Sequence, residues 1–389
     1  MPALLLYGDT ERTPAVRHEV PIAIGDPLLF AQLDGRSVVL TSRLERERVA
    51  AAMPSVEILD FFEHGFKELL EDGHSRRDAQ LEVVARVVSE LGIAQAIVPS
   101  AFPVGLADRL RAGGVELRVD DESIDARRRA KAGPELDGIR AAQRAAEAGM
   151  AAAAALLAKA EPGPDGRLLL DGRDVLAEDV RAALRSACEA EGAPAPPDVI
   201  VSSVRQGFGH EPGSGPLPAG LPIQVDLWPR HEATGCWADM TRTFVVGEPE
   251  DEHAELIAEQ EGLVREALES ARSAARPRVT GRHLWEATCD TFEAAGFRTQ
   301  RTGPGEDPNE GFQFSLGHGV GLEVHEPPAL GLGGHDPLVA GDVIAIEPGL
   351  WDRRIGGVRF EDLLLITEDG CETLTRYGYD LAPVPQSVL

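Results

Sequence analysis

Strand-like and helix-like patterns of apolar residues alternate along the first third of the chain. Short apolar runs at 37–41 and 96–98 are typical of strands, whereas residues 43–53 and 75–91 place apolar side chains three and four positions apart, as amphipathic helices do. This alternation predicts an α/β domain. The charge-dense segment 120–131 follows it, and we expect this segment either to link two domains or to begin a solvated helix.

The rest of the chain carries longer helical patterns and then becomes rich in strand-like runs. Helices are expected at 134–160, 175–191, 252–275 and 282–295, and strands at 199–206, 221–228 and 236–246. We therefore divide the chain into an α/β domain at residues 1–130 and an α+β domain at residues 131–389. Two domains also suit a length of 389 residues.

Composition and charge exclude several classes of protein. The chain has 38 basic and 65 acidic residues, a formal net charge of −27, which argues against a protein that must neutralise nucleic-acid phosphates. No apolar run approaches the roughly 20 residues of a membrane span, and the first residues lack the pattern of a signal peptide. The four cysteines lie far apart, as free thiols in a reducing compartment do. We expect a cytoplasmic protein that binds neither nucleic acid nor a membrane.

Carboxylates placed inside apolar strands are the first candidates for a functional site, because burying an unpaired charge costs free energy. Asp226 lies in LPIQVDLWP and Asp239 lies in GCWADMTRTF, on either side of a predicted hairpin loop at residues 231–235. In an antiparallel hairpin the two carboxylates can face each other. Each could instead be an aspartate that caps a turn.

A second hairpin repeats the arrangement. Glu347 ends the apolar run of DVIAIEPGLW, Glu361 precedes the run of GGVRFEDLLLIT, and residues 353–357 are expected to form the turn. Between the hairpins lies SLGHGVGLEVHEPP, where His318 stands between two glycines that let backbone approach closely, and His325 follows.

The charges of these side chains indicate what they hold. Four carboxylates carry −4, which two divalent cations would cancel, and two such ions can share carboxylates and a hydroxide. Oxygen ligands with one imidazole favour Mn²⁺, while Co²⁺, Fe²⁺ and Zn²⁺ are also compatible. Calcium is disfavoured, because it rarely takes imidazole.

These residues, in the motifs ADMTRTF, GHGVGLEVHE, IEPG and GVRFED, resemble the dinuclear site of the methionine aminopeptidase, prolidase and aminopeptidase P superfamily. The similarity covers residue 134 onward and implies a pita-bread catalytic domain of the α+β class. The preceding α/β domain resembles the amino-terminal domain of prolidases and creatinase. Methionine aminopeptidases generally lack that domain, so the resemblance favours the Xaa-Pro branch.

The resemblance also implies a role for each matching residue. Asp239 and Glu361 would bridge two metal ions, Asp226 would complete the shell of one ion, and His318 and Glu347 that of the other. Hydroxide between the ions would attack the scissile carbonyl.

Further residues would then serve the substrate. Glu347 would move the proton to the leaving amine, and His325 would contact the substrate and the tetrahedral intermediate. His210 matches an upstream substrate-site histidine, although it could be an ordinary exposed loop residue. Arg359 matches an arginine that supports the site in prolidase-like members, although an ordinary ion pair would look the same.

Three departures from the family pattern concern the substrate's surroundings. The loop between the two aspartates is about two residues longer than usual, an even insertion that keeps the strand faces. Phe314 stands where prolidases and aminopeptidase P usually carry a histidine, and Trp351 stands where a tyrosine is common. The strictness for proline is therefore left open.

The leading hypothesis is a homodimeric metallo-exopeptidase that hydrolyses Xaa-Pro bonds of dipeptides or short peptides. One alternative keeps the fold but hydrolyses a small non-peptide amide, as the ectoine-derivative hydrolases do. Another is a non-catalytic binding protein on the same scaffold.

Overall fold

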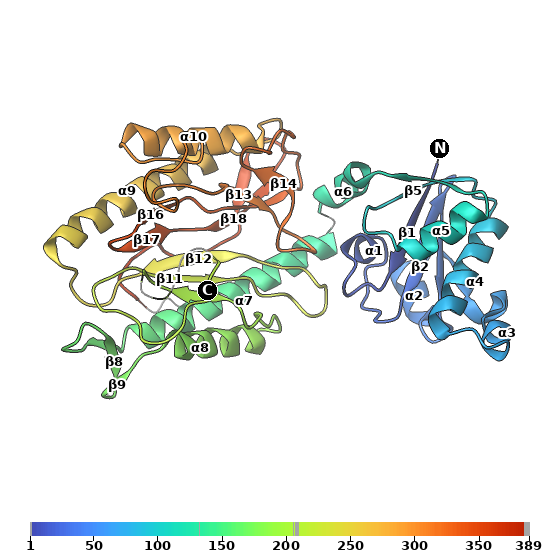
Figure 1. Ribbon diagram of the computed structural model, residues 1–389, viewed down its shortest axis with the longest axis horizontal. Coiled ribbons are helices and arrows are strands. Elements are labelled where there is room, and N and C mark those ends of the chain that lie inside the picture. Colours follow the sequence, from blue (N-terminus) through green and yellow to red (C-terminus); the bar gives the residue numbers. More distant parts are fainter. Residues whose placement is uncertain (1, 132, 205, 207–209, 385–389) are drawn as a thin grey trace. The chain divides into compact units, whose positions relative to one another are not determined.

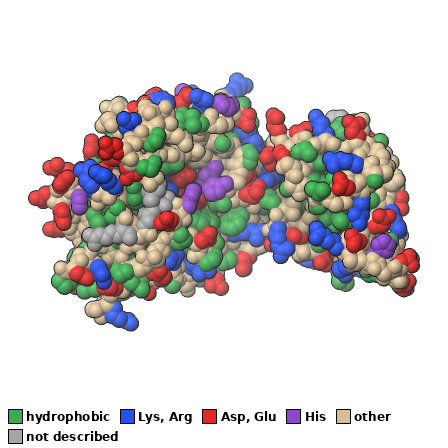
Figure 2. All heavy atoms as spheres, viewed as in Figure 1, with side chains coloured by type: hydrophobic (Ala, Val, Ile, Leu, Met, Phe, Trp, Pro, Cys, Tyr) green, Lys and Arg blue, Asp and Glu red, His purple; other side chains and the backbone are tan. Residues whose placement is uncertain are grey.

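The computed structural model describes residues 2–131, 133–204, 206 and 210–384. The chain divides into two compact units, residues 1–128 and residues 129–389. Figure 1 shows the elements of both units. Figure 2 shows acidic and basic side chains interspersed over the face of each unit that it draws. None of the helices in the described part of the chain is long and apolar enough to cross a membrane.

The first unit is built on a six-stranded sheet in the order β4-β3-β2-β1-β5-β6. The strands of this sheet are β1 (Ala3–Gly8), β2 (Leu28–Leu33), β3 (Arg36–Thr41), β4 (Glu57–Asp60), β5 (Gln95–Val98) and β6 (Glu116–Val119). Its helices are α1 (Pro14–Glu19), α2 (Arg46–Ala52), the 3-10 turn η1 (Phe61–His64), α3 (Phe66–Glu71), α4 (Arg76–Glu90), α5 (Val104–Ala112) and α6 (Asp121–Arg129). The β1-β2 and β2-β3 pairs are antiparallel, and the other pairs are parallel.

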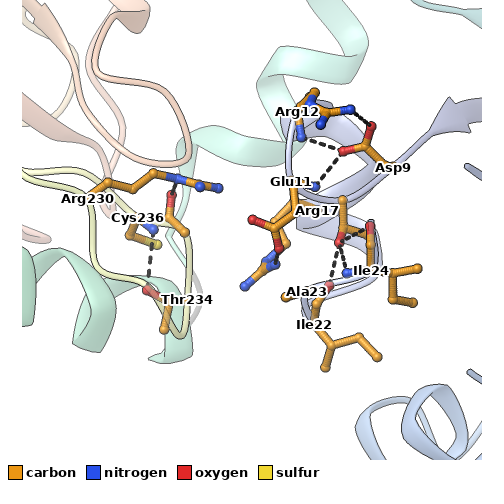
Figure 3. A network of polar contacts seen from close by, with 12 residues as sticks. Asp9, Glu11, Arg12, Arg17, Ile22, Ala23, Ile24, Arg230, Thr234 and Cys236 are labelled. Carbon is orange, nitrogen blue, oxygen red and sulfur yellow. Dashed lines mark hydrogen bonds and ion pairs between the residues drawn. The ribbon is translucent and has the colours of Figure 1, made fainter. Parts of the chain in front are cut away.

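Both faces of this sheet are buried, which explains its continuous apolar runs. Leu5 and Val38 belong to the core on one face together with residues of α4, and Leu6 and Val39 belong to the core on the other face together with residues of α1. Before α1, the carboxylate of Asp9 accepts hydrogen bonds from two successive backbone amides (Figure 3).

The charged segment 120–131 mostly forms helix α6, as the second alternative expected, and the division between the two units also falls within it. Asp121 and Glu122 lie in its first turn, where acidic side chains favour the helix dipole. Ile124 is buried in the core of the first unit. A run of charges thus forms a helix with one buried apolar contact.

Over its described residues, the second unit contains four long helices and the remaining strands. The helices are α7 (Gly133–Leu157), α8 (Ala177–Ala190), α9 (Asp251–Ala274) and α10 (Gly281–Ala294). The strands are β7 (Glu161–Pro162), β8 (Leu168–Leu170), β9 (Arg173–Asp174), β10 (Ile200–Ser202), β11 (Ile223–Leu227), β12 (Met240–Phe244), β13 (Gly317–Gly319), β14 (Glu326–Leu330), β15 (Val343–Ile346), β16 (Gly349–Asp352), β17 (Gly356–Arg359), β18 (Asp362–Ile366) and β19 (Cys371–Thr373).

Two sheets lie between two pairs of helices in this unit. The three-stranded sheet β10-β11-β12 packs against α7, and the five-stranded sheet β14-β13-β15-β18-β19 shares a core with α9 and α10. In Figure 1 the strands run between α7 and α8 on one side and α9 and α10 on the other. This arrangement is the α+β architecture expected of the second domain.

The strands near the site are shorter than the sequence predicted. The expected strand 199–206 is regular only at β10, because the Ser203 amide donates to the side chain of Gln206 and turns the chain; residues 205 and 207–209 lie outside the described residues. The expected strand 236–246 is regular only at β12, because residues 236–239 belong to the preceding loop. The turn of the second hairpin spans residues 353–355.

Candidate metal centre

The first hairpin presents two carboxylates on one face. Asp226 lies in the central strand β11, directly opposite Thr241 of β12. Asp239 directly precedes β12, and its carboxylate lies close to that of Asp226, since both belong to one group of donor atoms. Both aspartates are buried, with 6% and 4% of their surface exposed.

The loop that joins β11 and β12 is folded on itself. The Arg230 guanidinium Nε donates to the carbonyl of Gly235, and the Cys236 amide donates to the Thr234 hydroxyl (Figure 3). An isolated bridge between Arg230 and Trp237 closes the loop. These contacts hold the loop closed between the two aspartates.

The second hairpin is interrupted where its two glutamates lie. Its base is the β15-β18 pair, which ends with Ile346 opposite Asp362, and its tip is the β16-β17 pair, which begins with Gly349 opposite Arg359. Glu347 and Glu361 occupy the break between these pairs, where neither residue belongs to a strand. The break lets both carboxylates turn toward the first hairpin.

His318 reaches the same place from β13. An added Cβ at Gly317 would lie 1.9 Å from the carbonyl oxygen of Ala345, and one at Gly319 would lie 2.3 Å from that of Pro327. Glycine on both sides therefore lets β13 fit between its neighbours. His318 Nδ1 lies 3.1 Å from the Gly319 carbonyl oxygen, which favours the tautomer whose Nε2 is free to accept or ligate.

The five predicted ligands converge in overlapping groups of donor atoms. Within each of three groups the donor atoms lie within 4.8 Å of one another. The groups are Asp239 with His318 and His325, His318 with Glu347 and Glu361, and Asp226 with Asp239 and Glu361. His318 Nε2 is 3.7 Å from an oxygen of Asp239 and 3.7 Å from one of Glu347.

The buried carboxyl groups of this centre repel one another when ionised, so a bound cation would stabilise them. Burial and then the neighbouring Glu361 raise the pKa of Asp239, and burial and then Glu347 raise the pKa of Glu361. Burial raises the pKa of Glu347 to about 7. Burial lowers the pKa of His318 to about 4, so its imidazole is neutral at pH 7.

These residues fit divalent cations. Asp226 Oδ1 is buried and lacks a hydrogen-bond partner in the described part of the chain, as expected of an oxygen that awaits a ligand. Four converging carboxylates and a neutral imidazole supply hard oxygen donors and one nitrogen. A structural role for the aspartates as turn caps would not explain why they converge with two glutamates from another hairpin.

Arg359 partly compensates the carboxylates. Its guanidinium pairs with Asp226 and lies 3.5 Å from an oxygen of Glu347. The Thr243 hydroxyl holds the backbone of Arg359 from β12, accepting from its amide at 3.0 Å and donating to its carbonyl at 3.1 Å. Arg359 thus joins the two hairpins within the site and forms no ordinary surface pair.

A cavity of about 530 Å³ opens beside the carboxylates. His210, His325 and Arg359 line it, so the structure brings all three predicted substrate residues to one space. The rings of His318 and His325 lie 4.1 Å apart. Partial burial and then the neighbouring His210 lower the pKa of His325.

Two of the three departures from the family pattern lie in the same cavity. Phe314 and Trp351 both line it. The ring of Phe314 packs edge-on against Phe312 at 4.8 Å between centroids. The indole of Trp351 lies against Gly357, where an added Cβ would come within 2.9 Å of it. One wall of the cavity is therefore aromatic and rigidly supported.

Sequence reasoning missed the residues that orient the ligands. The Thr241 hydroxyl donates to the carboxylate of Glu361 at 2.8 Å, and the Glu361 amide donates to the Thr241 carbonyl at 3.1 Å. The sequence did offer one signal for Thr241. It belongs to the motif ADMTRTF and follows the predicted ligand Asp239 by two residues.

Comparison with known proteins agrees with this geometry. The family described as Metallopeptidase family M24 matches residues 137–368. The Xaa-Pro dipeptidase of Pyrococcus horikoshii is 34% identical over 189 residues, which cover 48% of this chain and 49% of that protein. The matched segment thus spans about half the length of this relative.

Solved structures with the same fold extend over nearly the whole chain. The prolidase from Pyrococcus horikoshii superposes with a TM-score of 0.74 at 23% identity, covering 98% of this chain and 95% of that chain. The X-Pro aminopeptidase from Thermotoga maritima gives a TM-score of 0.76 at 21% identity, covering 98% and 97%. These similarities confirm the predicted fold of an α/β amino-terminal domain followed by a pita-bread domain.

Proposed function

The chain belongs to metallopeptidase family M24, and from this premise we propose that it hydrolyses Xaa-Pro bonds of dipeptides or short peptides. The observation that carries the proposal is the overlap of the three groups of donor atoms. Asp239, His318 and Glu361 each belong to two of the groups. The names of the relatives support the substrate class, and they do not favour hydrolysis of a small non-peptide amide or a role as a binding protein.

Five side chains would hold two divalent ions. We assign Asp239 and Glu361 as bridging ligands, Asp226 to one ion, and His318 and Glu347 to the other. Among the carboxylates, Asp239 and Glu361 each belong to two groups of donor atoms, which supports this division. His318 also belongs to two groups, but its imidazole offers one free nitrogen and cannot bridge two ions. When bound, the ions would supply an activated water at neutral pH and polarise the scissile carbonyl.

Glu347 is suited to carry the proton in this reaction. Its carboxylate borders the cavity that would hold the peptide, and a carboxylate there can accept and release a proton. It would accept a proton from the attacking water and release it to the leaving nitrogen. Arg359, beside an oxygen of Glu347, would keep that carboxylate oriented during both transfers.

The remaining cavity residues would bind the peptide. The acidic side of the cavity would attract the free ammonium group of the substrate. Arg359 Nε is buried without a hydrogen-bond partner in the described ranges and would donate to a substrate oxygen. His210 and His325 would contact the substrate from the same side, and Phe314 and Trp351 would supply an apolar surface for its side chain.

Hydrolysis of matched peptides by metal-reloaded protein tests the proposal. The protein is stripped with chelator, reloaded with Mn²⁺, and assayed with an Xaa-Pro dipeptide, an Xaa-Pro-Yaa tripeptide and a non-proline dipeptide. Cleavage of proline peptides supports the proposal, and the preferred length distinguishes a dipeptidase from an aminopeptidase. A metal-replete protein that leaves every proline peptide intact would refute it. Asp239→Asn should abolish activity and serves as the negative control.

Manganese, a homodimeric state and a cytoplasmic location stay predictions. Reloading with Co²⁺, Fe²⁺ or Zn²⁺ in parallel compares the metals by their specific activity. Light scattering during size-exclusion chromatography measures the mass of the assembly. Fractionation of cells that express the protein tests its location.

A further inference from the structure

A buried arginine outside the ligand set uses all of its hydrogen-bond donors. Arg242 of β12 is 1% exposed. Its guanidinium donates to five acceptors at 2.7–2.9 Å, namely the carbonyls of Thr241, Glu361, Tyr377 and Gly378 and the carboxylate of Asp362. A guanidinium has five N–H donors in a fixed plane, so the positions of these acceptors are fixed relative to one another.

The acceptors of Arg242 include the backbone of a bridging ligand. Arg242 follows Asp239 by three residues and donates to the carbonyl of Glu361 and to the carboxylate of the next residue, Asp362. β12 belongs to the three-stranded sheet and β18 to the five-stranded sheet. Arg242 therefore ties together the two sheets whose strands β12 and β18 begin directly after Asp239 and Glu361, the two carboxylates proposed to bridge the ions.

The other acceptors lie in residues 374–381, which we call the tail. Side chains from four different elements hold the tail, which has no regular secondary structure before residue 381. These contacts are Glu147 of α7 to the Arg376 amide at 2.6 Å, Arg242 of β12 to two carbonyls, Arg265 of α9 to the Tyr379 carbonyl at 2.7 Å, and Asp362 of β18 to the Tyr379 hydroxyl at 2.5 Å.

Tyr379 also covers the guanidinium. The Arg242 Cζ atom lies 4.6 Å from the centre of the Tyr379 ring, a cation–π distance. Asp362 is fully buried, so the charge of Arg242 has a buried partner on one side and an aromatic face on the other. Removing the Asp362 carboxylate would leave the buried guanidinium charge without its anionic partner, and removing the Tyr379 ring would take away its aromatic cover.

From these contacts we infer that Arg242 is a positioning residue of the metal centre, and that the tail is what holds it in place. Arg242 touches neither the cavity nor a ligand oxygen, and it acts by fixing Glu361 relative to Asp239. The inference rests on the proposed metal centre and is independent of which peptide is cleaved.

Metal binding by two variants tests this role. Arg242→Lys keeps the charge but supplies donors from one atom, and Tyr379→Phe removes only the hydroxyl bonded to Asp362. Isothermal titration calorimetry measures the affinity of the chelator-stripped protein for Mn²⁺. For Arg242→Lys, at least one ion should bind roughly 10–100-fold more weakly, which is the loss seen when residues that orient metal ligands are replaced. Tyr379→Phe should change the affinity in the same direction by a smaller factor.

The absorption spectrum of Co²⁺-loaded protein gives a readout that a purely structural role would not move. We expect its bands to shift in both variants, because they report ligand geometry. Arg140→Met is the matched control, because Arg140 pairs with Glu372 of β19, and both side chains are partly exposed. It should bind Mn²⁺ and Co²⁺ as the unmodified protein does.

Unchanged affinity and an unchanged Co²⁺ spectrum in Arg242→Lys would overturn the inference, even if the variant unfolds at a lower temperature. If Arg242→Lys does not yield folded protein, the result for Tyr379→Phe decides in the same way. Unmodified protein that binds both ions but cleaves no peptide would refute the proposed peptidase activity and leave this inference standing.

Discussion

Replacement of Arg359 by methionine probes how the site tolerates four carboxylates. In the metal-free protein its guanidinium pairs with Asp226 and lies 3.5 Å from Glu347, and the three side chains are 10%, 9% and 17% exposed. Methionine keeps much of the length and removes the charge. Asp226 and Glu347 would then face Asp239 and Glu361 without a cation.

The cost follows from the burial of the pair. Breaking a buried ion pair by removing one partner costs about 3–5 kcal/mol. For a unit of this size each kcal/mol corresponds to about 2–4 °C, so Tm of the metal-free protein should fall by roughly 6–20 °C. In the metal-loaded protein the fall should be smaller, because bound cations supply the charge that Arg359 supplied.

Thermal unfolding followed by circular dichroism, with chelator and with Mn²⁺, measures both values. Arg301→Met is the matched control, because Arg301 also bridges two carboxylates, those of Asp290 and Glu293, with its side chain 34% exposed. An exposed pair contributes about 1 kcal/mol or less. Equal losses in the two variants without metal, or no recovery of Arg359→Met with metal, would refute the reasoning.

Three further predictions concern the same site. The pKa of Glu347 is raised from 4.5 to about 7 in the folded protein, so the folded state binds a proton more tightly than the unfolded state. The raised pKa values of Asp239 and Glu361 act in the same direction, and the lowered pKa of His318 acts in the opposite direction. Because three carboxyls outweigh one imidazole, unfolding curves of chelator-stripped protein should show stability falling as pH rises from about 4.5 to about 7, and a rise over that window would contradict this. Gly317→Ala places a Cβ 1.9 Å from the Ala345 carbonyl oxygen. It should lower the free energy of unfolding, measured with denaturant, by about 1–3 kcal/mol, and it should reduce the metal content measured by mass spectrometry. Full metal content at normal stability would speak against it. Phe314→Ala should lower kcat/KM for Xaa-Pro peptides roughly tenfold, equivalent to the ~1.5 kcal/mol of one buried apolar side chain, and unchanged kinetics would mean that the ring does not contact the substrate.

The long helices, and the strands β3 and β5 of the first sheet, could be predicted from the sequence. Helix α7 was expected at 134–160 and α9 at 252–275, and both lie within three residues of these bounds. Their apolar residues repeat at helical spacing because one face packs on a sheet, and that spacing is a local property of the chain. Helix α6 could not be distinguished from a linker, because charged residues dominate its sequence and its main apolar contact, Ile124, is made to a distant core.

The converging side chains could be chosen from the sequence, but not the structure that holds them. Asp226 and Glu347 stood out because a carboxylate within an apolar run needs a partner. The break in the second hairpin, the hydroxyl of Thr241 and the five bonds of Arg242 depend on segments far apart in the chain, and no local pattern specifies such contacts. Arg242 in particular looks like any polar residue of an alternating strand.

The contact between the two hairpins, made by Thr241 and Glu361, also affects the order in which this unit folds. Each hairpin pairs residues close in sequence, so it can form early and bring together two carboxylates. Thr241 and Glu361 are separated by 120 residues, and closing so large a loop is slow compared with local pairing. The contact between the hairpins must therefore form late, against the repulsion between the carboxylates of one hairpin and those of the other. Divalent cations present during refolding should speed the docking of the two hairpins, because they screen the repulsion between the carboxylates.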